Sequence, residues 1–120
     1  MTERVAGIGG VFFRARDPEA LKRWYGDNLG IELEDFGTVF TAAAGDQTVW
    51  APFSGDTEYF GSREQQSMIN YRVHDLDAML AQLRAADAEV DEHVEEHEYG
   101  RFGWATDPEG NRFELWQPPR

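Results

Sequence analysis

Residues 99–116 read YGRFGWATDPEGNRFELW and carry the strongest structural signal in the chain. The DPEGN segment at 107–111 predicts a turn, because Pro presets φ, Gly accepts positive φ, and Asp and Asn bond their own backbone. Both flanks alternate and carry aromatic side chains, as half-buried strands do. Alternation places Arg112, Glu114 and Trp116 on one face of the second strand. A carboxylate between an arginine and a tryptophan is a candidate for chemistry, although a solvated polar face explains the pattern equally well.

The composition limits the classes of protein that this chain can be. At 120 residues, with 41% hydrophobic and 13% aromatic residues, it has room for one domain with a real core and is unlike a disordered chain. Cysteine is absent, which excludes disulfides, thiolate metal sites and cysteine nucleophiles. The 11 basic and 23 acidic residues give a net charge of −12, which disfavours binding to nucleic acid.

Neither end of the chain nor its interior suggests export or membrane insertion. No basic and apolar leader opens the sequence, and no apolar run approaches the length of a membrane span. We therefore expect a soluble, cytoplasmic protein that does not contact membranes.

The first half predicts a strand, a capped helix and three short strands. Residues 7–16 are rich in β-branched and aromatic residues, which favours a strand. Asp17 is a typical N-cap, Pro18 suits the first helical position, and Gly30 can end the helix in the left-handed conformation. One face of this helix should be buried through Leu21, Trp24, Tyr25 and Leu29. The three short strands are predicted at residues 31–35, 39–43 and 47–53.

The second half repeats this order after a polar loop at residues 56–66. Residues 67–74 predict a strand, and Asp75 caps a helix whose apolar positions are Leu76, Met79, Leu80 and Leu83. Residues 89–97 predict a strand or an acidic extended segment, which leads into the closing strand pair.

The two halves are related by a constant shift. Asp17 and Asp75 differ by 75 − 17 = 58 positions, and the same shift pairs Val11 with Ile69 and Arg14 with Arg72. We therefore expect an α+β fold of two βαβββ repeats, at about 5–54 and 67–118 with the loop 55–66 between them. Each repeat is too small to close a core alone, so the two should form a single domain over residues 1–120 around a shared concave surface.

This duplicated order resembles the vicinal oxygen chelate superfamily, which includes glyoxalase I, extradiol dioxygenases and bleomycin-resistance proteins. The likeness is carried by residues 16–30, 73–77 and 107–115. It implies a glyoxalase-like fold whose curved mixed sheet surrounds a cleft that holds a metal or a small-molecule ligand. It also implies a homodimer.

The resemblance also places the metal ligands of the superfamily, and this chain lacks most of them. Glu114 matches the ligand position in the last strand, whereas the positions in the first and fifth strands fall on Gly10 and Met68. Gln47 is the only conceivable ligand in the fourth strand. Tight sites need three or four protein donors, so a divalent metal is disfavoured and no cofactor is predicted. A site at His93 and His97 with neighbouring glutamates is an alternative, but such residues are far more often solvated.

The resemblance suggests a ligand site around Glu114. If Glu114 faces the cleft, alternation brings other side chains to the same side, namely Phe12, Arg14, Asn70, Arg72, Arg112 and Trp116. Aromatic and polar residues would form two rims, namely Trp50, Phe53, Tyr59 and Phe60, and Tyr99, Arg101 and Phe102. An aromatic pocket with a few polar groups is the usual composition of a small-molecule site. Phe12 and Phe53 fit the hydrophobic core equally well.

Two functions fit this site. The first is a lyase or isomerase in which Glu114 is the acid and base, and Arg14 or Arg72 stabilises an oxyanion. The second is a non-catalytic protein of the bleomycin-resistance type that sequesters a ligand, which the acidic charge and the aromatic rim favour. A structural module without a ligand is a third interpretation.

Overall fold

The computed structural model describes residues 2–119, which form two helices and eight strands. The elements in chain order are β1 (Val5–Ala15), α1 (Pro18–Leu29), β2 (Thr38–Thr41), β3 (Gln47–Ser54), β4 (Ser67–Val73), α2 (Leu76–Ala85), β5 (Glu89–Val90), β6 (Glu95–His97), β7 (Gly100–Thr106) and β8 (Arg112–Gln117). Parallel and antiparallel strand pairs both occur, so the predicted α+β class with a mixed sheet is confirmed. Neither described helix has the length and apolar character that a membrane span requires.

The chain divides into two compact units. The N-terminal unit comprises residues 10–67, and the C-terminal unit comprises the residues up to Gly9 together with those from Met68 onward. Strand β1 therefore contributes its first residues to one unit and its last residues to the other. The predicted repeats at about 5–54 and 67–118, joined by the loop 55–66 within one domain, stay a prediction.

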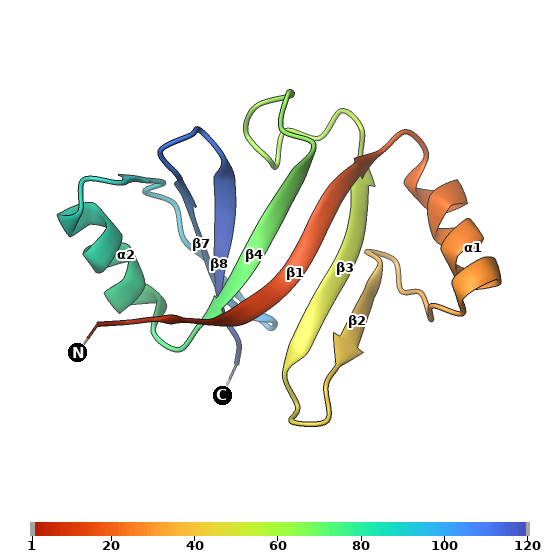
Figure 1. Cartoon of the computed structure of the whole chain (residues 1–120), viewed down its shortest axis with the longest axis horizontal. Coiled ribbons are helices and arrows are strands. Elements are labelled where there is room, and N and C mark those ends of the chain that lie inside the picture. The colour runs from red at the N-terminus through yellow and green to blue at the C-terminus, as the bar shows by residue number, and fades with distance from the viewer. Residues whose placement is uncertain (1, 120) are drawn as a thin grey trace. The chain divides into compact units, whose positions relative to one another are not determined.

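In the C-terminal unit the strand order is β4-β8-β7-β5, and β6 also pairs with β7. Strand β4 is parallel to β8, whereas β7 and β8 are antiparallel neighbours. Helix α2 lies beside β7 and β8 (Figure 1). It buries Leu76, Met79 and Leu80 against Val73 and Leu115, as its apolar spacing predicted.

The predicted turn between the closing strands is present. The Oδ1 atom of Asp107 accepts hydrogen bonds from the backbone N–H groups of Glu109 (2.9 Å) and Asn111 (3.0 Å), and Gly110 adopts a φ of +89°. These bonds, with that of the Asn111 side chain, hold the pKa of Asp107 below its ordinary value. The hairpin register follows from the turn. Thr106 pairs with Arg112, and each residue before Thr106 pairs with the residue that lies equally far after Arg112.

In the N-terminal unit the order is β2-β3-β1, with β3 parallel to β1 and antiparallel to β2. The strand predicted at residues 31–35 is wrong, since these residues lie outside every strand. Glu34 and Gly37 exchange backbone hydrogen bonds, and the buried Lys22 ammonium donates to the Asp35 carbonyl. The backbone groups that a strand would need are therefore used in a local turn and a side-chain contact.

Helix α1 has the predicted ends but only part of the predicted buried face, since Leu21 and Tyr25 are half-buried. Asp17 caps it by accepting from the Ala20 N–H (3.1 Å), and Gly30 ends it at a φ of +69°. Trp24 and Leu29 are nevertheless 54% and 61% exposed, so their predicted burial is wrong. Lys22 is the buried residue of this helix. Its long side chain can be buried because its ammonium group reaches the Asp35 carbonyl and the Glu19 carboxylate.

Candidate functional site

Glu114 is the only buried carboxylate within residues 2–119, at 1% exposure. It lies on β8, directly opposite Asn70 of β4 and Trp104 of β7. The Nδ2 atom of Asn70 donates to its Oε1 atom (2.6 Å), and the indole Nε1 of Trp104 donates to its Oε2 atom (3.0 Å). Each carboxylate oxygen thus has a neutral donor from a different strand. Such bonds offset the large cost of removing a carboxylate from water, and the solvated-face interpretation is therefore wrong.

Alternation gathers further predicted residues on the face of the sheet that carries Glu114. Tyr71, Phe113 and Leu115 pack toward α2, so their immediate neighbours on the same strands, Arg72, Glu114 and Trp116, face the other way. The Nη1 atom of Arg72 donates to the Ile8 carbonyl of β1 (2.6 Å), which fixes its guanidinium beside β4.

Arg112 also belongs to this face. Its guanidinium carbon lies 5.5 Å from the centre of the Trp104 ring, and its Nη1 atom lies 3.4 Å from the Asp91 carboxylate. The backbone N–H of His93, and then Arg112, lower the pKa of Asp91. The Arg112 guanidinium therefore lies over the indole ring of Trp104, which donates a hydrogen bond to Glu114.

Aromatic stacks continue the same face. Phe102 stacks on Trp116 with 6.1 Å between ring centres, and His97 stacks on Phe102 at 4.9 Å. His93 lies parallel to Trp104 at 5.9 Å. Trp104 is a site residue that the sequence analysis missed, and His93, which was considered there only as a possible metal ligand, lies parallel to its ring. The predicted turn at 107–111 could have revealed Trp104, because counting outward from it pairs residue 104 with Glu114.

Gly9 of β1 lies against this face. An added Cβ atom there would come within 2.2 Å of the Asn70 Oδ1 atom and 2.7 Å of the Trp116 Cε3 atom. Asn70 is 2% exposed, and its Oδ1 atom has no hydrogen-bond partner among the described residues. Glu114 thus orients the Asn70 amide, and the amide oxygen lies against the backbone of Gly9, which has no side chain.

Two predicted ligand-binding residues of the C-terminal unit lie elsewhere. Arg101 faces away from its neighbour Phe102 in β7 and donates to the Asp77 carboxylate of α2 (2.9 Å), an interaction that raises the pKa of Arg101. Tyr99 lies in the turn before β7 with a side chain 58% exposed, and its carbonyl accepts a hydrogen bond from the Trp116 indole (2.8 Å). The structure does not bring either side chain to Glu114.

Arg14, in the N-terminal unit, braces a loop. Its guanidinium donates to four backbone carbonyls at 2.9–3.1 Å and lies 5.2 Å from the centre of the Phe60 ring. The carbonyls belong to Gly55, Thr57, Ser62 and Gln65. Its predicted ligand-binding role stays a prediction, since most of its donors already have protein partners.

The aromatic side chains of this unit form two clusters on opposite faces. Trp50 contacts Phe13 and Tyr25, so it faces α1 rather than a rim. Phe53 contacts Phe12 and Phe60 at 5.2 Å each on the other face. Phe60 is fully buried, which makes this second cluster part of the core of the unit.

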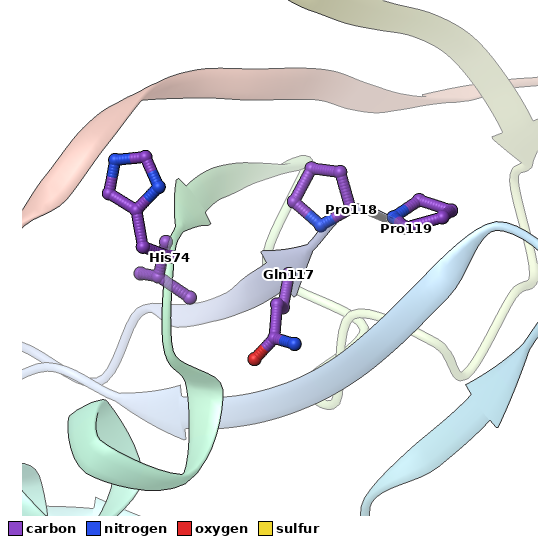
Figure 2. A pocket seen from close by; sticks show the side chains of 5 residues that line it. His74, Gln117, Pro118 and Pro119 are labelled. Carbon is purple, nitrogen blue, oxygen red and sulfur yellow. The ribbon is translucent and has the colours of Figure 1, made fainter.

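A pocket of about 340 Å³ opens in the C-terminal unit, apart from Glu114. Figure 2 shows the side chains of His74, Gln117 and Pro118 around it. The Gln117 side-chain oxygen accepts from the Leu76 N–H (2.8 Å), so this residue caps α2. Because the lining comes from strand ends and not from the Glu114 face, the pocket is a separate feature.

The fold and the Glu114 face can now be compared with known proteins. Residues 7–115 match the family model of the Glyoxalase/Bleomycin resistance protein/Dioxygenase superfamily. The chain belongs to this superfamily. The resemblance predicted from the sequence is therefore confirmed. None of the curated proteins is significantly similar to this glyoxalase-superfamily chain.

Several solved structures share the fold. Methylmalonyl-CoA epimerase from Mycobacterium tuberculosis has 20% identity and a TM-score of 0.72, covering 100% of this chain and 93% of its own. A Streptomyces coelicolor methylmalonyl-CoA epimerase in complex with 2-nitronate-propionyl-CoA has 16% identity and a TM-score of 0.71, with coverages of 93% and 96%. The Mn(II)-bound glyoxalase from Novosphingobium aromaticivorans has 20% identity and a TM-score of 0.63, with coverages of 95% and 39%. Identities this low show a common fold only.

The residues at the superfamily's metal positions do not fit a divalent cation. Gly10 offers no side chain, the Met68 thioether is a soft and weak donor, and Gln47 is exposed at the start of β3. Glu114 supplies oxygen, but its oxygens already accept from Asn70 and Trp104. Across residues 2–119, no three His, Asp or Glu side chains are arranged to hold a metal ion.

Proposed function

We propose that this protein is a glyoxalase-like isomerase or lyase of small carbonyl compounds, with Glu114 as its acid and base. The observation that carries the proposal is the buried Glu114 carboxylate, held by one donor on each oxygen. Titratable groups that are buried and oriented in this way occur preferentially at functional sites. Two of the solved structures that share the fold are named methylmalonyl-CoA epimerases. Methylmalonyl-CoA is a carbonyl compound, which supports the same reaction class.

The proposed step moves one proton. A C–H bond next to the substrate carbonyl breaks, its proton passes to a Glu114 oxygen, and its electron pair moves onto the carbonyl oxygen to give an enolate. Arg72 lies on the same face and is tethered by the Ile8 carbonyl, so a fixed guanidinium can stabilise the developing oxyanion. The substrate carries a hydroxyl on the carbon that loses the proton, as a methylglyoxal–thiol adduct does, so the intermediate is an enediolate. Glu114 returns its proton to the former carbonyl carbon, the hydroxyl proton passes to the former carbonyl oxygen, and a new carbonyl forms on the first carbon, which completes the isomerisation. We derive no step through a metal ion, because the donor set does not fit one.

The single buried carboxylate favours one kind of isomerisation. A base that both takes and returns the proton works on one face of the substrate, which suits a 1,2-proton shift. Inversion at one carbon needs a second acid on the opposite face. Glu114 is the only carboxylate buried within residues 2–119, so the shift is the reaction that we propose.

Proton exchange provides the test. The protein is incubated in D2O with methylglyoxal–thiol adducts and with methylmalonyl-CoA, with and without a chelator, and deuterium incorporation is followed by NMR. Glu114→Gln should reduce exchange by about 10²-fold or more. Glu95→Gln, a change at a half-exposed glutamate of β6, is the matched control and should leave exchange unchanged. Exchange that survives Glu114→Gln contradicts the proposal.

A second candidate function is ligand sequestration of the bleomycin-resistance type. The stacked ring pairs His93–Trp104 and Phe102–Trp116, together with the net charge of −12, favour a cationic aromatic ligand. A cationic glycopeptide should then raise the thermal midpoint in proportion to the logarithm of its concentration. Glu114→Gln should preserve that shift if the protein sequesters and does no chemistry. The homodimer stays a prediction that light scattering can check.

A further inference from the structure

Trp104 reaches Glu114 because of the hairpin register. The two residues are direct partners across β7 and β8, and Asn70 is the direct partner of Glu114 across β4 and β8. Glu114 thus lies on the middle strand of three, with a donor on each side. The indole reaches Oε2 at 3.0 Å and the amide reaches Oε1 at 2.6 Å, so neither donor duplicates the other.

The indole is itself held in place. Trp104 is 2% exposed, His93 lies parallel to its ring, and the Arg112 guanidinium lies 5.5 Å from the ring centre. A ring enclosed in this way cannot turn its N–H away without breaking several contacts. The hydrogen bond to Glu114 therefore exists before any ligand arrives, and it needs no reorganisation during a reaction.

From this geometry we infer that Trp104 and Asn70 are positioning residues, which fix the orientation of the Glu114 carboxylate. That this orientation serves catalysis rests on the proposed function, whereas the hydrogen bonds that hold Glu114 do not depend on it. Donors that point at a carboxylate favour the charged state over the protonated state. A base prepared in this way is aimed when substrate binds.

Carbon-detected NMR of the Glu114 side-chain carboxyl tests the inference without a substrate. Trp104→Phe keeps an aromatic ring, removes the N–H donor and leaves a smaller side chain, a loss of volume that the Trp116→Phe control shares. The carboxyl titration midpoint should rise by about 1 to 2 pH units, which corresponds to the loss of one hydrogen bond to a charged group. Trp116→Phe is the matched control, because Trp116 lies on the same face but donates to the Tyr99 carbonyl. Its titration midpoint should match that of the unmodified protein.

A second variant keeps the test decisive if Trp104→Phe does not fold. Asn70→Leu removes the other donor, and the midpoint should again rise. A folded variant at either position with an unchanged midpoint would overturn the inference. Deuterium exchange measured on the same proteins separates the two proposals. If the midpoints rise while Glu114→Gln retains exchange, the positioning is right and the proposed reaction is wrong.

Discussion

The side-chain amide of Asn70 lies between the Glu114 carboxylate and the backbone of Gly9. Its nitrogen is 2.6 Å from Oε1 of Glu114, and its oxygen, for which residues 2–119 supply no hydrogen-bond partner, occupies the space that a Cβ atom of Gly9 would enter. The amide nitrogen faces Glu114 and donates to it, and the amide oxygen faces Gly9. Asn70 therefore links β8 to the start of β1, and both contacts can be tested separately.

Asn70→Asp tests the contact with Glu114. The substitution keeps the shape but replaces a donor with a second carboxylate, and two adjacent carboxylates resist ionising together. We expect the free energy of unfolding to fall by about 2–4 kcal/mol at pH 7, and by less at pH 5, where one shared proton relieves the repulsion. Denaturant titrations at both pH values measure this. Asn28→Asp, at an exposed position on α1, is the control. An equal loss at both pH values would contradict the assignment.

Gly9→Ala tests the contact with the backbone. The new Cβ atom would lie 2.2 Å from the Asn70 oxygen and 2.7 Å from the Trp116 ring, so one of these buried groups must shift. Overpacking of this kind costs about 1–3 kcal/mol. The comparison is Gly45→Ala, where a Cβ atom meets nothing within 4 Å and only the φ of +92° is unfavourable. Urea denaturation measures the stability of both variants, and NMR follows the titration of the Glu114 carboxyl on the same proteins. The titration should be perturbed in Gly9→Ala and unchanged in Gly45→Ala. Identical behaviour of both variants would refute the close approach.

Local signals in the sequence were sufficient for the helix caps and the closing turn. Asp17 and Asp75 accept from the N–H groups three residues ahead, and Asp107 organises its own turn, so each depends on neighbours in sequence. The hairpin register followed from that turn and would have identified Trp104 as the partner of Glu114. The family resemblance was readable for the same reason, because its motifs coincide with these local signals.

Features that depend on tertiary contacts were not predictable. The side of β3 on which Trp50 lies depends on its packing with Tyr25 of α1, and the ion pair of Arg101 with Asp77 joins two residues 24 positions apart in the chain. The burial of Lys22 depends on a carbonyl 13 residues away. No periodicity in the sequence reports such contacts.

Arg14→Met tests the bracing of the loop between β3 and β4. Met preserves apolar contact with Phe60 but removes every donor to the four loop carbonyls. Hydrogen bonds from a charged group contribute about 1.5–3 kcal/mol, so the loop should open at least about tenfold more often. Tryptic cleavage after Arg63 should accelerate accordingly, as followed by mass spectrometry. Arg16→Met, at an exposed neighbouring position, is the control and should leave this rate unchanged. Equal cleavage rates in both variants would show that other contacts hold the loop.

Asp107→Ala tests the closing turn through pH. Hydrogen bonds from the Asn111 backbone, from the Asn111 side chain and from the N–H groups of Glu109 and Gly110 hold the pKa of Asp107 below its ordinary value of 3.8. A carboxyl whose pKa is lower in the folded state adds stability that is fully present above the unfolded value. That stability is lost as the pH falls through the folded value.

The thermal midpoint of Asp107→Ala should therefore lie below that of the unmodified protein at pH 7, and by a nearly constant amount down to about pH 5. Below pH 3.8 the difference should narrow, because protonated Asp107 is a weaker acceptor for the same N–H groups. Glu109→Ala is the control, since Glu109 contributes its backbone N–H to this turn. Its midpoint should follow that of the unmodified protein at every pH. A difference for Asp107→Ala that stays constant through the acid range would mean that the ionised carboxylate does not hold the turn.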